Sequence, residues 1–138
     1  MTKYLFDSSV LIALSRGKSP QLHKRVRAAI TSGAQFLLCE PVAMEYIAGF
    51  PIARIAEQNR YLNSFALLSL DPHRDFRAAG SMFATLRDKG VTVRGTMDCL
   101  IAVIAMAAED VTLIHDDRDF ELMSRHVPLR QERWSAAG

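Results

Sequence analysis

The sequence predicts an α/β fold in which helices cover both faces of a mostly parallel sheet. Short apolar segments that read as strands alternate with segments of helical periodicity along the whole chain. The segments between the strands are long enough for crossover connections, which join parallel strands. One helical segment, DCLIAVIAMAA, is apolar on all sides, so it is expected in the interior of the molecule.

The expected strands span residues 3–6, 35–39, 66–70 and 111–115. Ser8 and Ser9 are expected to cap a first helix that Gly17 ends, and Pro20 is expected to open a second one. A third helix runs from Pro41 towards residue 49, and further helices span roughly 52–63 and 72–89. Thr96 is expected to cap the apolar helix, and residues 119–124 form a last short one.

Composition places the chain among ordinary globular domains. With 138 residues, 49% hydrophobic and 23% charged, it fits one domain with a substantial core and excludes a disordered chain. We expect one domain over residues 1–131 and a frayed tail over 132–138. Cys39 and Cys99 form no CxxC pair and are expected to be free thiols in the cytoplasm. No apolar run reaches the roughly 20 residues that span a bilayer, and MTKYLFD does not resemble a signal peptide.

The net charge of +2 conceals a basic surface. Thirteen of the seventeen basic residues are arginine, the side chain best shaped for bidentate contact with phosphate. If four of the fifteen acids hold a metal ion, eleven acids remain against seventeen basic residues. Such a surface attracts a polyanion, although each arginine taken singly also fits a solvated helix face.

Four acids are expected at one edge of the sheet, where ligands bind in parallel α/β folds. Asp7 follows the first strand, and Asp117 follows the strand at 111–115. Glu45 lies one turn into the third helix, and Asp98 lies in the first turn of the apolar helix. Capping or turn formation explains Asp7, Asp98 and Asp117 singly, but it does not explain four acids together.

Clustered carboxylates repel one another and need a cation to stay ionised together. Oxygen ligands without a histidine or cysteine pattern suit Mg²⁺ or Mn²⁺ rather than zinc. Such ions can polarise a phosphodiester and lower the pKa of a bound water, so the acids and the arginines together indicate hydrolysis of a nucleic-acid backbone. Glycoside hydrolysis also uses paired carboxylates, but it needs no metal site.

Four segments carry a family resemblance: LFDSSVLIAL, EPVAMEYIAGF, VRGTMDCLIAVIA and LIHDDRDFELM. In order and spacing they resemble the motifs of PIN-domain nucleases, specifically the VapC toxins of bacterial toxin–antitoxin pairs. The resemblance covers nearly the whole chain and implies a three-layer α/β/α sandwich that is often dimeric. It also implies a Mg²⁺- or Mn²⁺-dependent endoribonuclease acting on structured RNA such as tRNA, a VapB-like antitoxin that blocks the site, and products with 5′-phosphate and 3′-hydroxyl ends.

The same resemblance assigns roles to residues. It places Asp7, Glu45, Asp98 and Asp117 at the family's four acidic positions, with Asp119 as a frequent fifth metal ligand, and Ser9 as a hydroxyl that supports the first acid. His115 departs from the pattern, because the family commonly has Ser or Thr there. We expect His115 to support the site through a hydrogen bond, and Asp116 to be solvent-exposed.

Arg94, just before the apolar helix, is the best candidate for a phosphate contact, and Lys24, Arg25 and Arg27 form a second basic group. Two other classes of function remain open. A receiver or phosphatase also has Asp after its first strand, but Asp7 is followed by two serines rather than by a DxD pattern. A catalytically inactive member of the same fold would bind RNA or a partner protein without metal-dependent turnover.

Overall fold

The computed structural model describes residues 1–136 and contains a five-stranded sheet in the order β3-β2-β1-β4-β5. All four strand pairs are parallel. The strands are β1 (Lys3–Phe6), β2 (Gln35–Leu38), β3 (Ala66–Leu67), β4 (Val111–His115) and β5 (Gln131–Arg133). The helices are α1 (Ser8–Arg16), α2 (Pro20–Thr31), α3 (Glu40–Ala48), a 3₁₀ turn at Ile52–Arg54, α4 (Ile55–Leu62), α5 (Asp75–Asp88), α6 (Thr96–Ala107) and α7 (Arg118–Ser124).

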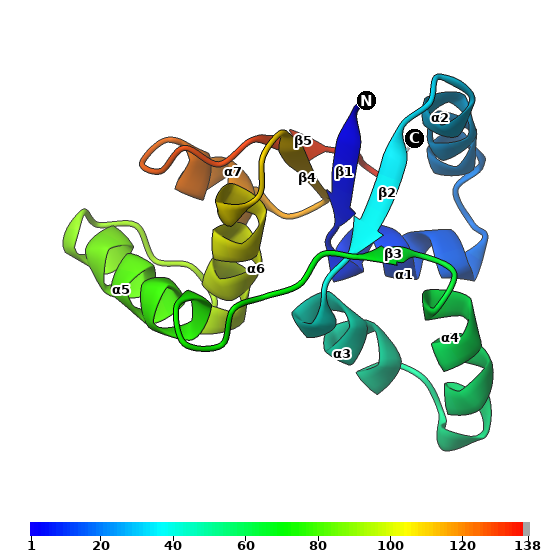
Figure 1. The fold of residues 1–138 in the computed structure, drawn as a ribbon, viewed down its shortest axis with the longest axis horizontal. Helices are drawn as coiled ribbons and strands as arrows, with labels where there is room; N and C mark the ends of the chain where they lie inside the picture. Colours follow the sequence, from blue (N-terminus) through cyan, green and yellow to red (C-terminus); the bar gives the residue numbers. More distant parts are fainter. Residues whose placement is uncertain (137–138) are drawn as a thin grey trace.

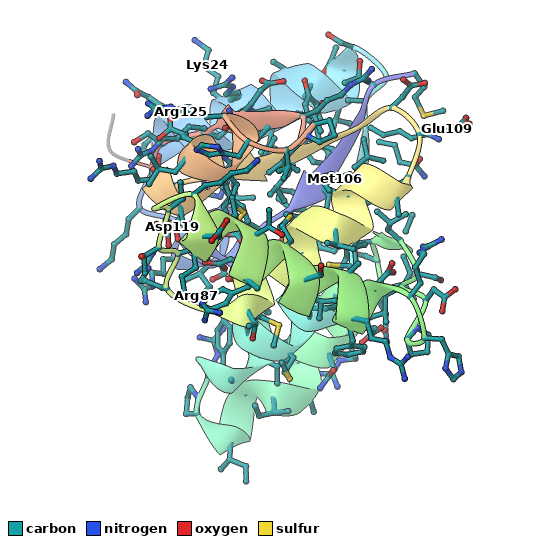
Figure 2. The ribbon with its side chains drawn as sticks, turned by 90° about the vertical axis from the view of Figure 1, so that its left-hand side faces the viewer. Lys24, Arg87, Met106, Glu109, Asp119 and Arg125 are labelled. Atoms are coloured by element: carbon teal, nitrogen blue, oxygen red, sulfur yellow. The ribbon has the colours of Figure 1, made fainter. Side chains whose placement is uncertain are left out.

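The helices lie on both sides of the sheet, so the predicted α/β fold with a parallel sheet and the three-layer α/β/α arrangement are confirmed. Figure 1 shows α5 and α6 on one side, with α1 and α2 on the other. Figure 2 shows α5 in front of α6, with the sheet behind both. β1 lies between β2 and β4, in register with Leu37 and Leu113 through Leu5. The chain therefore adds β2 and then β3 on one side of β1, and later adds β4 and then β5 on the other side.

The core is built on α6, whose apolar sequence predicted a buried helix. Seven consecutive residues of α6, from Cys99 to Ala105, are buried. They pack with the strands and with α5, and Phe6 stacks on Phe36 with ring centroids 4.9 Å apart. Both cysteines are free and buried, as expected. Among residues 1–136, no helix is long and apolar enough to cross a membrane.

Helix boundaries follow local signals, with two corrections. Asp7, not Ser8 or Ser9, is the N-cap of α1, because its carboxylate accepts the Ser9 backbone N–H at 3.2 Å. Gly17 ends α1 with a φ of 64°, a left-handed conformation that favours glycine. Gly95, not Thr96, is the N-cap residue of α6, and Thr96 is already helical. Ser19 caps α2 through the Leu22 N–H, directly before Pro20.

Three elements differ from the prediction by more than one-residue shifts such as the end of β2 at Leu38 instead of Cys39. The strand expected at 66–70 is only Ala66–Leu67, because it lies at the sheet edge and pairs with β2 alone. The helix expected at 52–63 begins as a 3₁₀ turn before α4. The helix expected from residue 72 starts at Asp75, since Asp71 first forms a turn whose carboxylate accepts the His73 N–H.

The expected frayed tail is wrong for the residues from Glu132 to Ala136. Gln131–Arg133 form β5, which pairs with β4, and the Trp134 side chain is only 2% exposed. The Trp134 ring packs edge-on against Tyr4 at 5.0 Å, and the Arg25 guanidinium lies 4.3 Å above it. An aromatic anchor thus holds the segment in place. Residues 137–138 lie outside the described part of the chain.

Candidate active site

Four predicted acids line one hollow of about 420 Å³ at the carboxyl ends of the central strands. Asp7 follows β1, and Asp117 lies two residues after β4 as the N-cap of α7. α3 contributes Glu45, and the first turn of α6 contributes Asp98. A larger hollow of about 510 Å³ beside α5 and α6 has a mainly apolar lining and no such group of acids. The structure therefore brings together the acids that the parallel topology predicted.

Asp7 is the most enclosed of these acids, at 4% exposure. One of its oxygens, Oδ2, accepts hydrogen bonds from the Ser9 hydroxyl at 2.6 Å and from the Ser9 backbone N–H at 3.2 Å. Burial raises the pKa of Asp7, and the Ser9 bonds oppose that shift. The Ser9 hydroxyl in turn accepts the Asp116 N–H at 3.0 Å, so it links the start of α1 to the loop after β4.

Asp98 and Glu45 show the electrostatic strain of this arrangement. Burial, followed by the charge of Asp7, raises the pKa of Asp98 to about 7. The same two causes raise the pKa of Glu45, whose Oε1 accepts a 3.3 Å hydrogen bond from the Ser8 hydroxyl. The ionised forms of these acids are thus disfavoured by lost hydration and by mutual repulsion. A cation in the hollow would relieve both costs.

Asp98, Asp117 and Asp119 come closest to a metal-binding group. One carboxylate oxygen from each lies within 4.8 Å of the others. Asp117 caps α7 by accepting the Asp119 N–H at 2.9 Å through Oδ1, which leaves Oδ2 directed elsewhere. The donor set consists only of carboxylate oxygens, which suits a hard divalent cation. The tightest group therefore lies towards α7, with Asp7 and Glu45 lining the same hollow.

Arg94 places a positive charge beside this group. Its Nη2 contacts Asp117 Oδ2 at 2.5 Å, and its Nε lies 3.6 Å from Asp119 Oδ2. Its backbone N–H also donates to Asp119 Oδ2 at 3.0 Å. The Arg94 side chain is 78% exposed, so the guanidinium can leave these acids at little cost. Arg94, predicted as a phosphate contact, therefore lies at the mouth of the hollow and is paired with acids.

His115 supports the site from a fully buried position. Its Nδ1 lies 3.1 Å from the Asp117 backbone N–H, and its Nε2 lies 2.7 Å from Gln131 Oε1. Since the Asp117 amide can only donate, Nδ1 accepts and Nε2 donates, which fixes the neutral tautomer. His115 thereby holds the backbone of Asp117 in place from inside the fold.

Sequence reasoning missed three supporting residues. Ser8 contacts Glu45, and its place beside Ser9 was the only signal for it. Gln131 holds His115 but comes from β5, which was taken for the end of the domain. Asp116 is not simply solvated: its Oδ1 accepts from Arg133 Nε at 2.9 Å, which ties β5 to the loop that carries Asp117.

Comparisons with known proteins agree with this fold. Residues 4–125 match the PIN domain family. "VapC ribonuclease Mb1587" from Mycobacterium bovis and "Ribonuclease VapC11" from Mycobacterium tuberculosis are each 32% identical over 128 residues, covering 91% of this chain and 95% of their own length.

Solved structures show the same fold. DNA-bound VapBC from Salmonella typhimurium superposes with a TM-score of 0.76 at 23% identity, covering 98% of this chain and 100% of that chain. VapBC2 from Rickettsia felis, bound to a promoter DNA fragment, gives 0.75 at 16% identity, with 97% and 100% covered. The chain therefore belongs to the PIN-domain family. Among its curated relatives are VapC ribonucleases, which it matches over nearly their whole length.

Proposed function

We propose that this chain is a metal-dependent endoribonuclease of the VapC type, acting as the toxin of a toxin–antitoxin pair. The observation that carries the proposal is the convergence of Asp7, Glu45, Asp98 and Asp117 on one hollow in a PIN-domain chain. Relatives named as ribonucleases, 32% identical over nearly their full length, support it. The substrate is RNA, with structured RNA such as tRNA as the first candidate.

Asp98, Asp117 and Asp119 would hold the cation, with Asp7 and Glu45 completing the site from β1 and α3. Mg²⁺ or Mn²⁺, when bound, supplies Lewis-acid activation of water and neutralises charge on the phosphate. The chain contributes position: Ser9 fixes the rotamer of Asp7, and His115 fixes the backbone of Asp117. Arg94 at the mouth of the hollow would donate hydrogen bonds to a phosphate oxygen of the RNA strand.

Two protein partners belong to the proposal. A VapB-like antitoxin would cover the site, by analogy with the VapBC structures that superpose on this chain. A second copy of the chain would form a homodimer, as the resemblance to VapC toxins implies. Light scattering of the purified chain, alone and with the antitoxin, measures both assemblies. The proposed reaction takes place in the cytoplasm, where RNA is present and Cys39 and Cys99 stay reduced.

The decisive experiment compares wild type with Asp7→Asn, which keeps the acceptor oxygen for Ser9 and removes the charge. Wild type should cleave RNA only with Mg²⁺ or Mn²⁺, and the variant should lose more than about 100-fold in rate with an unchanged melting temperature in EDTA. Sequencing of RNA ends after induced expression would name the substrate and reveal 5′-phosphate ends. Wild-type cleavage by the variant would refute the assignment. RNA binding without turnover by either protein would show an inactive member of the fold.

A further inference from the structure

A second hollow of about 380 Å³ adjoins the acidic one, and the two share the side chain of Ile12. Helices α1 and α3 contribute residues to both hollows. α1 begins at the acids and ends at Arg16, and α3 carries Glu45 before the chain reaches Phe50. α1 has nine residues, which makes it about 13 Å long. The second hollow thus lies within a few nucleotides of the acids, measured along an RNA strand.

The lining of this second hollow has no acidic residue and two arginines, Arg16 and Arg54. Arg16 is exposed, and within residues 1–136 no carboxylate lies within salt-bridge distance of it. Among the described residues, Arg54 forms its one salt bridge with Glu57, at 3.5 Å, and both side chains are more than half exposed. Exposed pairs of this kind contribute little free energy, so both guanidinium groups are available to a ligand.

Aromatic rings lie beside these charges. The Arg54 guanidinium lies 5.3 Å from the Phe50 ring centroid, and Phe50 packs against Tyr46 at 4.9 Å. Phe50 is half-buried, whereas Tyr46 is fully buried and donates its hydroxyl to Gln58 at 2.6 Å. The Phe50 ring therefore packs against Tyr46, has the Arg54 guanidinium over it, and remains partly exposed. Basic side chains beside such a ring are the combination that binds single-stranded nucleic acid.

We propose that this groove, lined by Ile12, Arg16, Phe50 and Arg54, binds the RNA strand next to the scissile phosphate. The inference rests on the proposed function and adds the path of its substrate. Arg16 and Arg54 contact backbone phosphates, and a base or ribose packs on Phe50. The acidic hollow would then lie between two basic flanks, with Arg94 at the other one. Each flank offsets the repulsion that the carboxylates exert on the RNA backbone.

The test is a salt titration of RNA binding in the Asp7→Asn background, which prevents cleavage. The double variant Arg16→Ala/Arg54→Ala is compared with Lys24→Ala/Arg27→Ala, which removes the same charge from α2. Figure 1 shows α2 beside β2, and Figure 2 shows Lys24 pointing outward into solvent. The probe is a single-stranded oligoribonucleotide derived from the mapped cleavage site, or a mixed-sequence oligoribonucleotide if no cleavage is found.

The groove variant should weaken binding about tenfold near 0.1 M salt and reduce the slope of log K against log salt by about 1.4. The α2 variant should show less than half of that change. Phe50→Leu should weaken binding with an unchanged slope, because stacking carries no charge. Equal losses in the two double variants would overturn the proposal, since net charge alone would explain them. Unchanged RNA binding with weaker antitoxin binding would also overturn it and assign the groove to the protein partner.

The outcomes separate this inference from the proposed function. The salt slope of RNA binding could fall in Arg16→Ala/Arg54→Ala while the wild-type protein never cleaves RNA. This result would support the groove as an RNA-binding surface and contradict the nuclease function. Normal wild-type cleavage with no effect of Arg16 and Arg54 would retain the nuclease and reject the groove.

Discussion

The Ser9 hydroxyl joins two loops of the site by donating to Asp7 at 2.6 Å while accepting from the Asp116 backbone at 3.0 Å. Ser9→Ala leaves the Asp7 oxygen without this bond and the Asp116 N–H without its acceptor. We expect the dissociation constant for Mn²⁺ to rise about 10- to 100-fold, as is usual when the support of a metal ligand is lost. Isothermal calorimetry measures it, and Ser9→Thr, which keeps the hydroxyl, should stay close to wild type. Equal affinities for Ser9→Ala and wild type would show that the bond does not position Asp7.

Replacing His115 should destabilise the fold as well as the site. In His115→Phe the ring can still pack against Phe120, whose centroid lies 5.0 Å from that of His115, but the Asp117 N–H and Gln131 lose their partner. Leaving a buried polar group unsatisfied costs about 1–3 kcal/mol, so urea unfolding should show a loss of that size. Gln131→Leu, which removes only the outer partner, should cost less. A fully stable His115→Phe variant would contradict a stabilising role of the two imidazole hydrogen bonds.

The raised pKa of Asp98, about 7, gives the metal-free protein a defined pH dependence. Burial and the charge of Asp7 raise it above the unfolded value of about 3.9. The folded chain therefore binds more protons between these values, and the free energy of unfolding should fall as pH rises from about 4 to about 7. The affinity of the site for Mn²⁺ should instead rise with pH, by up to about tenfold per pH unit below 7, because protons leave Asp98.

Melting temperatures in EDTA from pH 4 to 8, with and without Mn²⁺, test this dependence. Asp98→Asn cannot ionise, so its EDTA curve should fall less steeply, with the remaining decline due to Asp7 and Glu45, whose pKa values burial also raises, and Mn²⁺ should no longer raise its melting temperature. A wild-type curve that rises between pH 5 and 7 would show that other groups dominate.

Trp134 should contribute strongly to stability although it lies four residues from the C-terminus. Its ring is 2% exposed and packs against Tyr4 and Phe36. Trp134→Ala should cost about 3–5 kcal/mol, a value typical of large aromatic residues in a core. Arg25→Ala removes the half-exposed cation over the ring together with its exposed 3.4 Å salt bridge to Glu132, and it should cost about 0.5–1 kcal/mol. Chemical denaturation of both variants measures the difference, and a Trp134→Ala loss no larger than that of Arg25→Ala would contradict the packing argument.

The sequence predicted what depends on local periodicity and on the rules of parallel sheets. The apolar run in α6 indicated a buried helix, and the positions of Asp7 and Asp117 after strands indicated one shared edge. It did not predict β5, because Gln-Glu-Arg has no apolar alternation and forms a strand only by pairing with β4 far away in sequence. The support that Gln131 gives His115 was hidden for the same reason. Long-range pairing and side-chain rotamers leave no periodic signal.

The pairing of Arg94 with Asp117 and Asp119 leads to a prediction with two opposite signs. The guanidinium lies beside carboxylate oxygens that a divalent cation would use, so it competes with that cation. Both carboxylates are largely buried, but the guanidinium is mostly exposed and solvent screens its charge, so Arg94→Ala should tighten Mn²⁺ binding only about two- to fivefold. The same change should weaken RNA binding in the Asp7→Asn background and lower its salt slope by about 0.7, since one phosphate contact is lost. Calorimetry and a salt titration measure the two effects, with Arg118→Ala as the control because Arg118 is an exposed arginine between the two acids in sequence. If Mn²⁺ affinity fell together with RNA affinity, Arg94 would be a structural support of the acids rather than a cation that leaves them for the substrate.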